Sequence, residues 1–201
     1  MRELEKNQDK SGKGARPADR QAVEQCLVGR RTINRFIQRP VAQELLLEAI
    51  ECARWAPNHL LSEPWYFYIL GEQAVAATIE SIYTLTKEKK GEEMGQRKVR
   101  RAQKIPAWVV VTCQRSSDVI RQREDYAATS CAIHNFSLSL WTRGIGMKWC
   151  TGALVEDQRY YARLGIDYDQ ELMVGILRIG YPQIIPRQRR KNVDEISMLL
   201  D

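Results

Sequence analysis

Histidine is nearly absent from this 201-residue sequence, and no two cysteines have Cys-x-x-Cys spacing. Structural zinc sites need four Cys or His ligands at set spacings, so the sequence argues against a metal site. An odd number of cysteines also argues against a closed disulfide framework. We therefore expect free, mostly buried thiols in a reducing cytoplasm. The cysteines are Cys26, Cys52, Cys113, Cys131 and Cys150.

Long apolar runs are also missing. Residues 1–20 are polar and charged with no apolar centre, unlike a secretory signal. The longest stretch without Asp, Glu, Lys or Arg is 17 residues long, from Tyr126 to Thr142. It contains several hydroxyl and amide side chains, so it predicts a buried helix and not a membrane span. We expect a cytoplasmic protein with no membrane partner.

The basic charge is local, although 31 Lys and Arg against 25 Asp and Glu give a net charge of +6. Residues 1–20 hold six basic and four acidic residues, and the run 187–191 adds four basic ones, so the rest of the chain sums to zero. A nucleic-acid-binding module, the alternative that this charge suggests, would interleave a basic stripe with exposed aromatic residues. We expect no nucleic-acid partner, and a local anion site instead.

The length favours a single domain, over residues 21–201, after a disordered tail at 1–20. Predicted helices and strands do not alternate regularly, which favours an α+β fold with a central sheet. The charged segment 87–101 is either a solvated helix or a mobile flap. The expected helical regions are 22–29, 41–55, 72–104, 124–142 and 157–164, and the expected strands are 65–70, 105–113, a short strand ending at 149, and 172–179.

A basic segment near the N-terminus could bind a phosphate. Arg30, Arg31 and Thr32, followed by Arg35, combine guanidinium groups with a hydroxyl, and guanidinium groups bind phosphate oxygens in pairs. The same residues also fit a solvated basic turn between two helices. Both interpretations remain open from the spacing alone.

A second candidate segment follows the 124–142 helix. Trp149 to Gly152 stands at a predicted strand end, where it could line a flat ring or form a packed Trp and a turn. The preceding Gly144-Ile145-Gly146 has no third glycine and follows a helix, unlike a dinucleotide fingerprint. We expect Gly144 to cap that helix.

A cysteine nucleophile is the third possibility. Cys131 and His134 are three residues apart on the predicted helix and could touch, and Cys150 is another thiol. The stretch is uncharged and contains no acid that could orient the histidine. A buried cysteine without a charged neighbour is usually inert, so we expect no catalytic side chain of this kind.

The order of these segments is more informative than any one of them. The basic Arg-Arg-Thr precedes ECARWAPNHLLSEPWYFYIL, the uncharged helix leads into GIGMKWCTG, and the last strand is MVGILRIGYP. In this order the chain resembles the nitroreductase family of FMN-dependent oxidoreductases, over about residues 22–196. The resemblance implies a nitroreductase-like mixed α+β sheet flanked by helices, in an intertwined homodimer. FMN would lie at the subunit interface, and the 124–142 helix would form the dimer core.

The resemblance also implies where FMN binds. The Arg30–Thr32 segment would hold the phosphate and ribityl chain, the 58–61 loop would lie near the flavin, and the 149–152 segment would follow its ring. One of the arginines at 187–190 would supply a second phosphate contact, with the register left open. The implied residues are Arg30, Arg31, Thr32, Asn34, Asn58, His59, Leu61, Trp149, Cys150, Thr151, Gly152, Arg187, Arg189 and Arg190.

Three positions depart from the pattern of that family. Asn34 stands where the family often has Arg or Lys, Leu61 where an Asn frequently bonds the flavin ring, and Glu63 in place of a Gln. A leucine cannot bond the polar edge of the ring, and a carboxylate facing it would oppose flavin reduction. A Glu63 that points to solvent would only be a polar residue before the strand. The departures bear on FMN affinity, on the reduction potential of the flavin and on nitro-group reduction. We expect Leu61 and Glu63 to make the flavin a poorer electron acceptor than that of a typical relative.

The implied reaction is a ping-pong transfer of hydride from NAD(P)H through the flavin N5 to a small conjugated acceptor, such as a nitroaromatic or a quinone. The cofactor supplies this chemistry, so neither a catalytic side chain nor a metal is needed. A flavin-binding protein without turnover, for storage or sensing, is the alternative, because it would share every binding residue.

Overall fold

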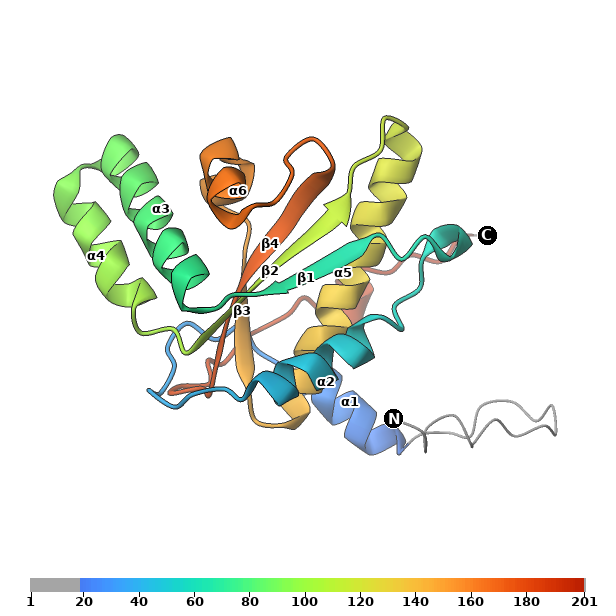
Figure 1. Cartoon of the computed structure of the whole chain (residues 1–201). Coiled ribbons are helices and arrows are strands. Elements are labelled where there is room, and N and C mark those ends of the chain that lie inside the picture. Colours follow the sequence, from blue (N-terminus) through green and yellow to red (C-terminus); the bar gives the residue numbers. More distant parts are fainter. Residues whose placement is uncertain (1–18, 201) are drawn as a thin grey trace.

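The computed structural model describes residues 19–200, which build one four-stranded sheet with helices on both faces (Figure 1). The strand order is β1-β2-β4-β3, and every neighbouring pair is antiparallel. In the described chain, parallel pairing is limited to the isolated bridge between Thr32 and Met147. The α+β prediction is confirmed, and this bridge is the parallel part of the expected mixed sheet. The strands are β1 (Trp65–Ile69), β2 (Ala107–Gln114), β3 (Gly146–Cys150) and β4 (Glu171–Gly180).

Helices α2 (Gln43–Ala53) and α5 (Val119–Thr142) cover one face of the sheet, and α3 (Glu72–Lys90), α4 (Glu92–Ala102) and α6 (Gln158–Leu164) lie on the other (Figure 1). The alternation of side chains along β2 explains the two layers. Val109 and Val111 pack toward α5, whereas Trp108 and Val110 pack toward α3 and α6. The unbroken apolar run of this strand therefore fills two cores.

Helix α5 begins at Val119, five residues before the predicted start. The carboxylate of Asp118 accepts hydrogen bonds from the backbone N–H groups of Ile120 and Arg121, at 2.8 and 3.3 Å, and so caps the first turn. The helix ends as predicted, because Gly144 adopts a φ of 71° and reverses the chain. Over its uncharged part, Tyr126–Thr142, one side of the helix is buried and the other is exposed.

The N-terminal helix α1 (Arg20–Gly29) starts inside the segment predicted as a tail, because the carboxylate of Asp19 accepts a hydrogen bond from the Ala22 N–H at 3.2 Å. The rest of that predicted tail, residues 1–18, lies outside the described residues. Within residues 19–200 there are also three short 3₁₀ turns, namely η2 (His59–Leu61), η3 (Ala153–Glu156) and η4 (Val193–Glu195).

The charged segment 87–101 is helical and forms the end of α3 and most of α4. The two helices pack antiparallel, and Gly95 allows close contact, since a Cβ there would lie 3.0 Å from the Tyr83 ring. Lys87 pairs with Glu92 across the connection, with Nζ 2.9 Å from Oε2. The segment is therefore a packed hairpin, and one side of it faces the sheet.

Candidate functional site

A cluster of arginines lies where α1 ends. Arg30 is half-buried, and within residues 19–200 its Nε atom is buried without a hydrogen-bond partner. Burial lowers the pKa of the Arg30 guanidinium, and the positive charges of Arg190 and Arg31 lower it further. Three like charges drawn together around an unsatisfied donor form a site that an anion would stabilise.

The chain after α1 is fixed against β3. Thr32 bridges to Met147, and the Ile33 N–H donates to the Met147 carbonyl at 3.0 Å. A side chain at Gly146 would collide with Ile33, so glycine is needed for this close approach. The arginine cluster is thereby held at the start of the strand whose end is Cys150.

Helix α5 forms the back of the arginine cluster. Burial lowers the pKa of His134, and the charge of Arg30 lowers it further. Cys26 of α1 donates from Sγ to the Leu138 carbonyl of α5, at 3.8 Å, and so joins the two helices. His134 therefore lies beside the cluster with a lowered pKa, and no hydrogen bond joins it to Cys131 within residues 19–200.

The C-terminal segment supplies the arginine that the sequence predicted beside Arg30, Arg31 and Thr32. Of the three arginines that the sequence left open, Arg190 is the one whose charge reaches Arg30. All three side chains are exposed, so only this interaction distinguishes Arg190 from Arg187 and Arg189. The structure therefore brings Arg30, Arg31 and Arg190 together from the two ends of the described chain.

Asn34 stands two residues beyond the Thr32 bridge and accepts a hydrogen bond from Lys148. The Lys148 Nζ lies 2.8 Å from the Asn34 Oδ1. Lys148 is opposite Arg178 in the β3–β4 register, so both side chains leave the sheet on the same face. A cation is therefore present beside Asn34, supplied by the strand and not by position 34 itself.

The end of β3 divides the predicted ring-binding segment between the two faces of the sheet. The Trp149 indole packs across Gly175, where a Cβ would collide with it, and donates to the Val174 carbonyl at 3.0 Å. Cys150 and Gly152 instead face the α3–α4 side and line a cavity, while Thr151 is exposed. The indole is thus part of the packing, and the next residues lead to an open face.

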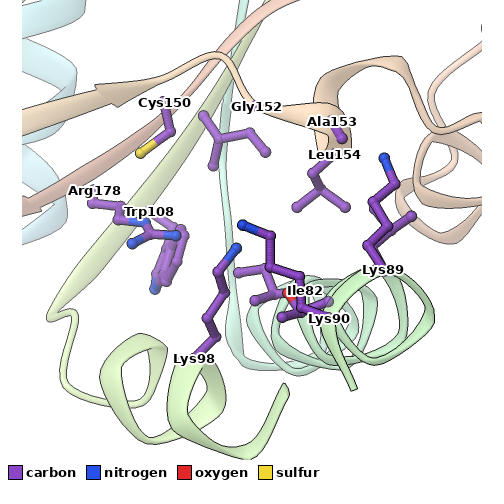
Figure 2. A pocket seen from close by; sticks show the side chains of 13 residues that line it. Ile82, Lys89, Lys90, Lys98, Trp108, Cys150, Gly152, Ala153, Leu154 and Arg178 are labelled. Atoms are coloured by element: carbon purple, nitrogen blue, oxygen red, sulfur yellow. The ribbon is translucent and has the colours of Figure 1, made fainter. Parts of the chain in front are cut away.

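The cavity between the sheet and the α3–α4 hairpin has a volume of about 160 Å³ (Figure 2). Lys89, Lys90 and Lys98 come from the hairpin, and Arg178 comes from β4. The sequence analysis missed these four residues. The only sequence signal was that the three lysines belong to the charged segment 87–101. Their convergence with Arg178 depends on how the hairpin packs on the sheet.

The 58–63 loop lies away from the arginine cluster within one chain. Its backbone is unusual, since Leu60, Leu61 and Glu63 have φ values of 53°, 54° and 41° without being glycine. The loop is held by Asn58 Oδ1, which accepts from the Glu63 N–H at 2.9 Å. It is also held by the Ser62 hydroxyl, which donates to a buried carboxylate of α5 at 2.9 Å. His59, Leu61 and Glu63 are exposed.

All five cysteines are free, as predicted, but only Cys113 is fully buried. Burial raises the pKa of the Cys113 thiol to about 11, which keeps it protonated. Across residues 19–200 no group of three or more His, Cys, Asp or Glu residues could hold a metal ion. No helix in that range is long and apolar enough to cross a membrane.

Comparison with known proteins gives a consistent family. A family model described as "Nitroreductase family" matches residues 27–181. The Bacillus subtilis (strain 168) protein named "Putative NAD(P)H nitroreductase YfhC" is 30% identical over 166 residues, which cover 81% of this chain and 85% of that protein. A crystal structure of a nitroreductase-like family protein from Bacillus cereus has a TM-score of 0.78 and 29% identity, covering 94% of this chain and 99% of that one.

More distant structures share the fold alone. A Desulfovibrio desulfuricans protein whose crystal structure was solved in complex with FMN has a TM-score of 0.73 and 17% identity. The match covers 89% of this chain and 96% of that one.

Proposed function

Because the chain belongs to the nitroreductase family, we propose that it is an FMN-dependent oxidoreductase that passes a hydride from NAD(P)H to a small conjugated acceptor. For a quinone acceptor, NAD(P)H, one proton and the quinone would give NAD(P)⁺ and the hydroquinone. FMN, when bound, would supply this two-electron chemistry, and the protein would supply binding, orientation and electrostatics. The relatives named above support the cofactor, and the free thiols support a reducing compartment such as the cytoplasm.

The observation that carries this proposal is the buried, unpaired Nε of Arg30 inside a cluster of like charges. A phosphate dianion would accept from Arg30, Arg31 and Arg190 together and would relieve their mutual repulsion. The residues present therefore fit the phosphate of FMN. Thr32 follows directly and would bond the ribityl chain through its hydroxyl.

The length of β3 fits the rest of the cofactor. Thr32 is beside Met147, and Thr151 is four residues farther along the chain. At about 3.3 Å per residue this spans about 13 Å, which is the scale of a ribityl chain and the ring that follows it. The ring would then lie toward Cys150 and Gly152, on the face where Lys148 bonds Asn34.

We propose further that the active form is a homodimer with FMN at the interface. Between Tyr126 and Thr142 the exposed side of α5 carries no charge, and the exposed Arg121, Arg123 and Glu124 are confined to its first turns. The neighbouring Leu60 and Leu61 are 86% and 83% exposed. The 58–63 loop contacts α5 at Asp125, whereas the arginine cluster lies near His134, about 13 Å along the same helix. If two α5 helices pair antiparallel about a two-fold axis, the loop of one protomer faces the cluster of the other.

An FMN titration of the cofactor-free protein tests the phosphate site. Arg30→Ala removes a charge-assisted contact and is expected to weaken FMN binding by about ten- to a hundredfold. Arg163→Ala is the matched control, because it removes a surface arginine of α6 that pairs with Glu80 of α3. It should leave FMN binding unchanged. Equal affinities of both variants and the native protein would refute the assignment of the phosphate site.

Turnover separates the enzyme from the storage alternative. The FMN-loaded protein is expected to oxidise NADH or NADPH continuously when a quinone such as menadione is present. Flavin that binds tightly and is reduced once, without repeated turnover, would show a flavin-binding protein of another kind. A purified protein without flavin absorption that also fails to take up added FMN would overturn the proposed function altogether.

A charge placed on the exposed side of α5 tests the dimer. Cys131→Asp is expected to shift the sedimentation behaviour from dimer to monomer, because an unpaired charge buried in an interface costs several kcal/mol. Ala162→Asp, at an exposed position of α6, is the control. Ser137 is unsuitable for this test, since it is only 4% exposed within its own chain. A native protein that sediments as a monomer at every concentration would refute the dimer.

A further inference from the structure

The cavity between β3, β4 and the α3–α4 hairpin is strongly basic. Lys90, Lys98 and Arg178 point into the same space in Figure 2, and none of the thirteen residues that line it is acidic. Burial lowers the pKa of Lys98, and the charges of Lys90 and Arg178 lower it further. The charges that precede Lys89 and Lys90 on α3 are neutralised, because Lys87 pairs with Glu92 and Glu88 with Arg159. The cations of the cavity face one another instead.

Two of the residues that line this cavity each hold a buried hydrogen-bond donor without an acceptor. Trp108 is 1% exposed, and its Nε1 is buried without a partner in the described part of the chain. The Nε of Arg178 is in the same state, and its guanidinium carbon lies 5.1 Å from the centre of the Trp108 ring. Unsatisfied buried donors are destabilising, so an acceptor that reached Trp108 and Arg178 would be favoured at this wall of the cavity.

The remaining wall of the cavity is apolar. Ile82, Leu85, Leu154 and Ile176 line it. A small inorganic anion would satisfy the donors but would leave this surface uncovered. A planar organic molecule that carries a carboxylate would use both, with its body on the apolar wall and its charge on Lys98 and Arg178.

We infer that this cavity binds the electron acceptor and selects anionic aromatic compounds, in particular carboxylates. The inference rests on the proposed function for one point only: Cys150 and Gly152 line the cavity and also belong to the strand end assigned to the flavin ring. A ligand held here is therefore next to the group that would reduce it. The cavity itself is built from residues of one chain.

Binding of 4-nitrobenzoate and of its neutral analogue nitrobenzene, followed by calorimetry on the FMN-loaded and the FMN-free protein, tests this inference. The native protein is expected to bind the carboxylate at least about tenfold more tightly, and added NaCl should reduce the difference. Lys98→Met and Arg178→Met are each expected to lose that preference and to leave nitrobenzene binding within about twofold. Arg101→Met, which removes a charge from the same helix outside the cavity, is the matched control.

Each opposite result overturns the inference. Equal binding of the two compounds by the native protein would show that the cations select no carboxylate. A loss of FMN affinity in Lys98→Met, without loss of carboxylate preference, would assign the charges to the flavin. Displacement of 4-nitrobenzoate by adenosine 2′,5′-bisphosphate, but not by AMP, would assign them to the reductant. Because the FMN-free protein is measured separately, a failure of the proposed function is distinguishable from a failure of this site.

Discussion

The contact between Trp149 and Gly175 allows a quantitative test of how β3 is held. In Gly175→Ala, the added methyl group would occupy the space of the indole, so the ring must leave its site. Overpacking of this kind costs about 1–3 kcal/mol, and loss of the Trp149 hydrogen bond to Val174 costs about 0.5–1.5 kcal/mol more. We therefore expect a destabilisation of about 2–4 kcal/mol, against a total stability of about 5–15 kcal/mol for a typical domain.

Urea unfolding of the cofactor-free protein at one fixed protein concentration measures this loss. The same alanine substitution is repeated in a Trp149→Val background, where the indole is absent and Gly175→Ala should cost less than about 1 kcal/mol. The difference between the two backgrounds is the coupling energy of the pair. A cost below about 0.5 kcal/mol in the native background, or equal costs in both, would refute the reasoning.

Four further predictions follow from single contacts. Burial raises the pKa of Tyr68, and so does Glu171, whose carboxylate accepts a hydrogen bond from the Tyr68 hydroxyl. Because the unfolded chain loses this proton at a lower pH than the folded protein, the free energy of unfolding should fall above about pH 10. Urea unfolding at a series of pH values should show a smaller fall in Tyr68→Phe. Asp118→Ala should cost about 1 kcal/mol of unfolding free energy through loss of the α5 cap, whereas a cost near zero would show that the cap is dispensable. A phosphate beside His134 should raise its lowered pKa, so FMN affinity should rise as pH falls into the range where His134 becomes protonated, and His134→Gln should flatten that slope in titrations. Leu61→Asn with Glu63→Gln should make the FMN midpoint potential more positive by tens of millivolts in a redox titration, and an unchanged or more negative value would contradict the role assigned to these residues.

Patterns along the chain predicted most of the fold. The run Val109–Val111 marked a buried strand, and the absence of charge over Tyr126–Thr142 marked the central helix, because both are local consequences of burial. Helix starts were less accurate, since one capping carboxylate decides them, as Asp118 does for α5.

The candidate site was only partly predictable. Arg30 and Arg190 are about 160 positions apart in the sequence, so their proximity depends on the folded path of the C-terminal segment. Lys148 and Arg178 meet through the strand register, which no local pattern encodes. The left-handed backbone at Leu60 and Leu61 also had no signal, because such conformations usually select glycine.

The meeting of Arg30 with Arg190 has a consequence for how a ligand would leave. The two residues belong to segments at opposite ends of the described chain, and their like charges repel when nothing lies between them. A phosphate bound by both arginines would attach the C-terminal segment to the rest of the protein through Arg190. Dissociation of FMN would then require residues 183–200 to detach from the rest of the protein, and would not require a cleft in the sheet to open. Protease cleavage within that segment should accordingly slow when FMN is added, which links cofactor retention to the order of the chain end.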